Sequence, residues 1–188
     1  MTARRLLILL ALTAASPPPT WGLPELMAQL RQVRTATGYF VERKYLHLLP
    51  DPLQSSGWLT YIAPDRLQKE TLEPKPARLT VDADHLTIER EGEKPRDIAL
   101  REIPELGALI ESIRATLAGD AAQLMRHHTV TLDGTASRWT LLLIPREPTL
   151  HRLITAIHIA GSGATIQSIQ TQEADGDHTD MTITADRR

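Results

Sequence analysis

The stretch Pro52-Leu53-Gln54-Ser55-Ser56-Gly57-Trp58-Leu59-Thr60-Tyr61-Ile62-Ala63-Pro64-Asp65-Arg66-Leu67 combines a turn, a strand and a second turn. Residues 55–57 have turn chemistry, residues 58–63 are aromatic, aliphatic or β-branched on both alternating faces, and Pro64 ends the strand because it has no backbone donor. A strand that is apolar on both faces has no plain water side. It is therefore either central in a two-layer core, or one of its faces lines an apolar cavity.

Short strands surround this stretch on both sides. Turn residues such as 161–163 and 175–177 separate them, as in successive hairpins. The further strand candidates are 39–45, 66–72, 78–81, 86–90, 96–100, 128–132, 139–144, 153–160, 165–172 and 179–184.

Three segments have helical spacing. Residues 23–35 are amphipathic, residues 104–119 begin with a proline and end at a glycine, and Asp120 is a candidate cap for a short helix through Met125. In the second segment Glu111, Ser112 and Arg114 are expected to lie away from the apolar face. That apolar face consists of Leu106, Leu109, Ile110, Ile113 and Leu117. We expect a mainly β fold with α-helices: an open or incomplete antiparallel β-barrel of about eleven strands, with helices covering its concave face.

Length and composition limit the domain organisation. With 188 residues and 41% hydrophobic content, the chain is long enough for one domain with a substantial core. A basic start at Arg4 and Arg5 precedes an apolar run at residues 6–12 that is too short to cross a bilayer, and small residues follow it. We expect a signal peptide at residues 1–22, cleaved after Ala15 or as late as Gly22, and a single domain at residues 23–188.

Charge and cysteine content exclude several classes of protein. Without Arg4 and Arg5 the chain carries 19 basic against 23 acidic residues, which argues against a nucleic-acid partner. It has no cysteine, and therefore no disulfide and no thiol for lipid attachment. We expect a soluble monomer in a bacterial periplasm, with secretion into the medium as the lesser alternative.

Catalytic and metal-binding patterns are weak. His127 and His128 are neighbours that would point to opposite faces of a strand, and the sequence around Ser162 lacks the strand-to-helix context of a nucleophile elbow. The turn at 175–177 lacks the remaining oxygen ligands of a calcium loop. We expect no catalytic residue, no metal and no cofactor.

Three motifs in order resemble the periplasmic outer-membrane lipoprotein carriers of the LolA type and their LolA-like relatives. Residues 38–44 (GYFVERK) resemble the family's opening G-x-F-x-Q strand, with glutamate in place of glutamine. Residues 56–67 (SGWLTYIAPDRL) resemble its G-x-L-x-x-x-R-P segment, and residues 166–177 (IQSIQTQEADGD) are similar to its last hairpin. The resemblance covers most of residues 23–188.

The resemblance has departures. The family usually has arginine before the proline, where this chain has Ala63, so the lid-locking role of that arginine cannot be carried over. Arg66 is the nearest guanidinium, a candidate for lid locking or docking. Lys69 stands where the family tends to have an aromatic residue. Ala83 stands where the family's Asp-Gly turn has glycine, and a positive φ there would cost on the order of 1 kcal/mol.

The resemblance implies a carrier that binds lipoprotein acyl chains or a lipid-like cargo in an apolar cavity. It also implies an inner-membrane donor transporter and an outer-membrane acceptor, between which the cargo moves. The expected cavity and lid residues are Leu59, Tyr61, Leu67, Leu106, Leu109, Ile110, Ile113 and Leu117. Two alternatives stay open: an envelope hydrolase with a reactive group such as Ser162, His127 or His128 in the cavity, and a scaffold whose apolar residues are all core.

Overall fold

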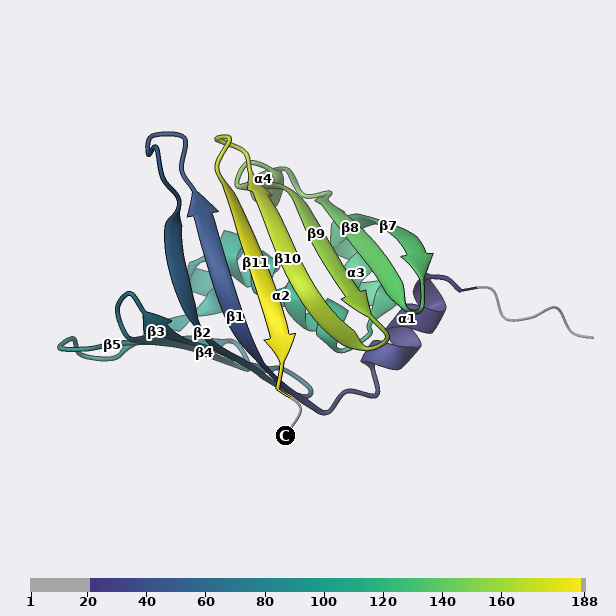
Figure 1. Ribbon diagram of the computed structural model, residues 1–188, viewed down its shortest axis with the longest axis horizontal. Helices are drawn as coiled ribbons and strands as arrows, with labels where there is room; N and C mark the ends of the chain where they lie inside the picture. The colour runs from purple at the N-terminus through teal and green to yellow at the C-terminus, as the bar shows by residue number, and fades with distance from the viewer. Residues whose placement is uncertain (1–20, 187–188) are drawn as a thin grey trace, which may run out of the picture.

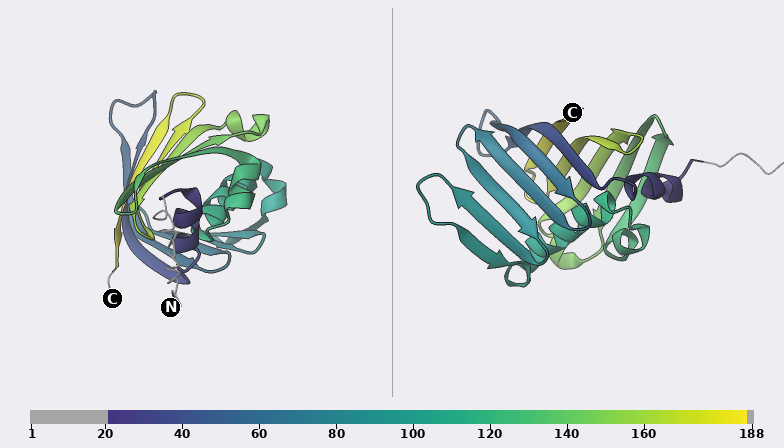
Figure 2. Two further views of the ribbon diagram at one scale, coloured as in Figure 1. Left: turned by 90° about the vertical axis from the view of Figure 1, so that its right-hand side faces the viewer. Right: turned by 90° about the horizontal axis from the view of Figure 1, so that it is seen from below.

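One antiparallel sheet organises the molecule. A computed structural model describes residues 21–186, and in that range eleven strands form a single sheet whose two edges are not joined (Figures 1 and 2). The helices lie on the concave side of this curved sheet, as the end-on view of Figure 2 shows. These observations confirm the expected open barrel of about eleven strands with a helical cover.

The strands follow a simple spatial order. From one edge of the sheet to the other they are β6 (Arg96–Ala99), β5 (His85–Arg90), β4 (Ala77–Asp82), β3 (Arg66–Glu73), β2 (Leu53–Ile62), β1 (Thr35–Tyr45), β11 (His178–Ala185), β10 (Thr165–Glu173), β9 (Ile154–Ser162), β8 (Arg138–Pro145) and β7 (His128–Thr135). The first and last strands, β1 and β11, pair in the middle of the sheet. All helices except α1 and α4 are inserted between the two edge strands, β6 and β7.

The described helices are α1 (Leu23–Leu30), the 3₁₀ turn η1 (Leu100–Glu102), α2 (Pro104–Leu117), α3 (Ala121–His127) and α4 (Pro148–His151). The first is shorter than the expected 23–35 because the chain is already extended in β1 from Thr35. Asp120 caps α3 as expected, since its carboxylate accepts a hydrogen bond from the backbone N–H of Gln123 at 2.9 Å. The short helix α4 lies where the sequence predicted only a loop.

Strand register determines which side chains face the helices. Phe40 on β1 is fully buried on the concave side and lies opposite Gly57 on β2, so Leu59 and Tyr61 also face inward. Trp58 faces outward and packs edge-to-face on Tyr39, with ring centroids 5.3 Å apart. The strand at 58–63 is therefore apolar on both faces because an aromatic pair covers part of its outer surface, and no second layer lies over that surface in the described chain.

Two separate clusters of buried side chains hold the helices on the sheet. The large cluster joins α1, α2, α3, α4 and the strands β8 and β9, and its members are Leu26, Met27, Leu30, Ala115, Leu124, Trp139, Leu141, Leu143, Leu150, Ile154, Ile157 and Ile159. The small cluster joins α2 and η1 to β4 and β5, and its members are Val81, Leu86, Leu100 and Ile110. Helix α2 therefore bridges two cores of unequal size.

Residues 1–20 of the expected signal peptide lie outside the described residues. Within residues 21–186, no helix combines the length and the apolar character needed to cross a membrane.

Candidate functional site

The concave face places the predicted strand residues side by side. Tyr61 on β2 lies directly opposite Leu67 on β3, and Leu59 is two positions away on the same face. Tyr61 is buried, its hydroxyl donates to the carbonyl of Pro64 at 3.3 Å, and burial raises the pKa of its phenol. Leu59 and Leu67 are only half-buried, so this part of the concave face is not fully packed.

The predicted helix residues divide between the two cores. Ile110 is buried in the small cluster, and Leu106 packs against that cluster together with Leu67. Leu109 packs against the large cluster instead. Ile113 and Leu117 are half-buried. The structure thus brings Leu67, Leu106 and Ile110 together, while the whole set of eight predicted residues does not form one cluster.

Arg114 connects α2 to the tips of two hairpins. Its Nε donates to the carbonyl of Asp65 in the β2–β3 turn at 2.8 Å, and its Nη2 donates to the carbonyl of Ala83 in the β4–β5 turn. Its Nη1 pairs with Glu111 on the same helix at 2.8 Å. The side chain is only 10% exposed. One guanidinium therefore fastens the helix to both turns on one end of the sheet.

Ser112 and Arg114, which were expected to lie away from the apolar face of α2, do not face solvent. Both are buried, because α2 is enclosed by the sheet on one side and by α3 and α4 on the other. The Ser112 hydroxyl donates to the carbonyl of Ala108 at 2.7 Å and lies 3.3 Å from Nε2 of His128. Polar side chains on this helix are thus internal connections rather than a solvent face.

Arg66, the candidate for lid locking or docking, lies at the surface. Its guanidinium is half-exposed and forms an ion pair of 3.6 Å with Asp82 across β3 and β4. The connection between helix and turns is made by Arg114 instead. Ala83 has a φ of 49°. The left-handed conformation considered for this position, where the family has glycine, is therefore present.

Histidines and turn residues of the hydrolase alternative have structural contacts. His127 closes α3 and its Nδ1 lies 2.6 Å from the carboxylate of Glu147. His128 begins β7 and is fully buried, and burial lowers its pKa. Ser162 ends β9 at the β9–β10 turn, on a different element from both histidines. The structure does not bring these three residues together as a nucleophile and its base.

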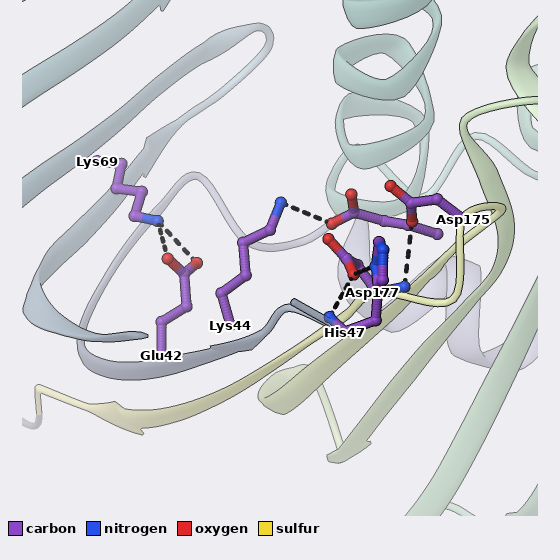
Figure 3. Close-up of polar contacts among 7 residues, drawn as sticks. Glu42, Lys44, His47, Lys69, Asp175 and Asp177 are labelled. Carbon is purple, nitrogen blue, oxygen red and sulfur yellow. Dashed lines mark hydrogen bonds and ion pairs between the residues drawn. The ribbon is translucent and has the colours of Figure 1, made fainter. Parts of the chain in front are cut away.

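A row of charged side chains crosses the concave face toward the loop between β1 and β2. Lys69 donates to both carboxylate oxygens of Glu42, at 2.8 and 2.7 Å (Figure 3). Its ammonium lies 4.8 Å from the centre of the Phe40 ring. Lys44 pairs with Glu173 at 2.9 Å, and this hydrogen bond raises the pKa of the lysine. Figure 3 shows Glu42, Lys44 and Lys69 pointing to the side of the sheet on which helix α2 lies.

An acidic group lies at the same end of the sheet. Carboxylate oxygens of Glu173, Asp175 and Asp177 are within 4.8 Å of one another, the spacing that a cation would need. Lys44 and His47 already engage this group: Asp177 accepts from the backbone N–H of His47 at 2.9 Å and from its Nδ1 at 2.8 Å. The backbone hydrogen bond from His47 holds the pKa of Asp177 below its usual range. The contacts present give this group a structural role at the β10–β11 turn.

Two shallow pockets lie on the outer face at this end, away from α2. One has a volume of about 180 Å³ and is bordered by Tyr45, Leu49 and Pro50 among others. The second is about 390 Å³, mostly polar, and lies over β10 next to His178. Neither borders the apolar part of the concave face. Helix α2 contacts that face through Ile110, with Leu106 packed beside it.

Sequence reasoning missed Arg114 and the Glu42–Lys69 pair. Arg114 is separated in sequence by 49 and 31 residues from the residues whose carbonyls it contacts. No local sequence pattern predicts contacts between residues so far apart. A signal existed for the pair: glutamate at position 42 and lysine at position 69 both depart from the family's pattern, with opposite charges.

The geometry defines a class of protein: an open antiparallel half-barrel whose apolar concave face is covered by a helix. That helix is fastened to the turns at one end of the sheet. The family profile described as "Outer membrane lipoprotein carrier protein LolA-like" matches residues 15–186. The chain belongs to this LolA-like family. A search of curated proteins finds no match.

Solved structures with a similar fold come from several bacteria. A LolA superfamily protein of Nitrosomonas europaea is 8% identical with a TM-score of 0.48, over 86% of this chain and 90% of that chain. Lipoprotein LppX of Mycobacterium tuberculosis is 9% identical with a TM-score of 0.44, over 88% and 97% of the two chains. A chain of the MucA/MucB complex of Pseudomonas aeruginosa is 12% identical with a TM-score of 0.44, over 86% of this chain and 54% of that chain.

Proposed function

We propose that this protein is a periplasmic carrier that binds the acyl chains of a lipoprotein, or another lipid-like cargo, on the apolar concave face beneath α2. It takes the cargo from an inner-membrane donor and delivers it to an outer-membrane acceptor. Membership of the LolA-like family supports the carrier role, and the expected signal peptide supports the compartment.

The main supporting observation is that one face of α2 contacts the strands through few buried side chains. The small cluster contains one α2 residue, Ile110, with Leu106 packed beside it. Burying these two side chains, of which Leu106 is only half-buried, stabilises the closed helix by roughly 2–4 kcal/mol. Arg114 adds its hydrogen bonds to the two turns. Separating this face of α2 from the strands therefore costs several kcal/mol. The burial of an acyl chain on the same surface can offset this cost.

The half-buried side chains beneath α2 give the cargo its contacts. Leu59 and Leu67 on the strands and Ile113 and Leu117 on the helix retain partial exposure with the helix closed. A hydrocarbon chain that covers them gains roughly 25 cal/mol for each Å² of apolar surface removed from water. This chemistry requires no cofactor and no catalytic group.

Neither alternative has a comparable observation in its favour. A hydrolase needs a nucleophile and a base that are within hydrogen-bond reach of one another and of the cargo. Ser112 and His128 lie 3.3 Å apart, but both are buried and the Ser112 hydroxyl donates to its own helix, so the pair does not face the cargo. A scaffold needs a fully packed concave face, while Leu59, Leu67 and Ile113 are only half-buried. The carrier accounts for both the closed helix and the incompletely packed floor.

The test is binding of a fluorescent sixteen-carbon acyl probe to the chain from residue 23 onward. Leu59→Gln places an amide on the concave face, and Thr60→Gln places the same amide on the outer face of the same strand. We expect Leu59→Gln to weaken binding by roughly 10- to 100-fold, the loss of about 1.5–3 kcal/mol of apolar contact. Thr60→Gln should leave the affinity unchanged. Equal effects of the two variants, or no binding by the native chain, would contradict the proposed site.

A further inference from the structure

The concave face changes from apolar to charged along the direction of its strands. Strand register places the inward residues of β1, β3 and β11 side by side in rows. We follow these rows from the end of the sheet that Arg114 contacts toward the β1–β2 loop at the opposite end. In that direction the inward side chains are Phe40, Glu42 and Lys44 on β1, Leu67, Lys69 and Thr71 on β3, and Ile183, Met181 and Thr179 on β11. Helix α2 is fastened over the apolar end.

The charged side chains retain access to solvent. The side chains of Glu42 and Lys69 are 20% and 25% exposed, and those of Glu173 and Lys44 are 26% and 40% exposed. At the apolar end, Tyr61 and Val81 are buried. A hydrocarbon chain laid over the charged end would cut the two ion pairs off from water without replacing their hydrogen bonds, which is unfavourable. A polar group of the cargo belongs at this end.

The charges at this end are of both signs and alternate. Two ammonium groups, of Lys44 and Lys69, and two carboxylates, of Glu42 and Glu173, form two ion pairs with no net charge among the four. Beside Glu173, Asp177 is paired with His47, and Asp175 is an exposed carboxylate that adds negative charge at the edge of this end. A purely anionic headgroup would meet the carboxylates, and a purely cationic one would meet the ammonium groups. A headgroup with both charges can accept hydrogen bonds from the lysines and donate to the carboxylates.

We propose that the concave face binds a zwitterionic amphiphile in one orientation. Its hydrocarbon chain lies beneath α2, and its anionic and cationic groups lie among Lys44, Lys69, Glu42 and Glu173 at the open end. The inference rests on the proposed carrier function and names the class of cargo for the same face. The Glu42–Lys69 pair is the specificity element, because it lies nearest the apolar floor, against Phe40.

The experiment measures displacement of the fluorescent acyl probe by three lipids with the same sixteen-carbon chain. They are lysophosphatidylethanolamine, which is zwitterionic, lysophosphatidylglycerol, which is anionic, and monopalmitoylglycerol, which is uncharged. We expect the zwitterionic lipid to bind the native chain at least tenfold more tightly than either of the others. In the double variant Glu42→Gln/Lys69→Met this preference should fall below threefold, while binding of the uncharged lipid persists.

The exchanged pair Glu42→Lys/Lys69→Glu is the control for folding, since it keeps one charge of each sign at the two positions. It should keep a zwitterionic preference of at least threefold over the uncharged lipid. Equal binding of the three lipids, preference for the anionic one, or an unchanged preference in the double variant would overturn the inference while the carrier function stands. If the native chain binds none of the three lipids and does not bind the probe, the carrier function is overturned and the inference with it.

Discussion

Replacing Arg114 by methionine should release α2 without unfolding the sheet. Methionine keeps an unbranched stem in the buried space but removes the guanidinium that bonds to Asp65 and Ala83. A hydrogen bond to a charged donor contributes about 1.5–3 kcal/mol. Because the carbonyls lie in turns whose residues are exposed or half-exposed, water can replace part of what is lost. We therefore expect α2 closure to weaken by about 2–4 kcal/mol in total.

Hydrogen exchange of backbone amides measures this change directly. A loss of about 3 kcal/mol raises the population of opened α2, and the exchange rate of its amides, by roughly 100-fold. Amides of β8 and β9, which belong to the large cluster, should keep their protection. The control is Arg126→Met on α3, whose side chain is exposed and bonds only to Gln123 among the contacts described.

Two results would refute this reasoning. If α2 in the Arg114→Met chain stays as protected as in the native chain, the guanidinium does not hold the helix closed. If protection falls equally in α2, β8 and β9, Arg114 stabilises the whole fold and opening of α2 is not a separate event.

Three further predictions follow from single positions. Ala83→Gly should raise the free energy of unfolding by about 1 kcal/mol, because φ is 49° there, whereas Ala77→Gly in β4 should lower it; thermal denaturation of both variants checks this. Burial lowers the pKa of His128 in the folded state. Unfolding therefore takes up a proton when the pH falls below about 6.5, and the free energy of unfolding then decreases by up to about 1.4 kcal/mol for each pH unit. His128→Leu should remove this dependence between pH 7 and 5.5 in chemical denaturation, and exposed His151→Leu should not. Ile113→Gln should weaken acyl-probe binding with a smaller effect on stability than Ile110→Gln, since only Ile110 is in the small cluster.

The strands and helices were predictable because their signals are local. Turn residues at 161–163 and 175–177 separate strands that alternate with period two, and the spacing of Leu106, Ile110 and Ile113 marks α2. The end of α1 was missed because no glycine or basic stop signal marks it. The short helix α4 begins with a proline, a favoured first residue, but its four residues are too few to show a helical period.

The contacts of the candidate site were not predictable in the same way. Glu42 and Lys69 meet because β1, β2 and β3 pair in a particular register, and a shift of one residue would place one of them on the opposite face. The helical pattern of α2 indicated one apolar face, but it did not reveal that Ser112 and Arg114 are also buried. Their positions depend on α3, α4 and two distant turns.

The most direct test of the carrier function is native mass spectrometry of the chain from residue 23 onward, produced in a bacterial periplasm and purified without detergent. Spectra are recorded before and after extraction with organic solvent, for the native chain and for Leu59→Gln. We expect a bound mass of lipid size on the native chain that is lost on extraction and reduced in the variant. Unliganded native protein that also takes up none of the added acyl probe would contradict it.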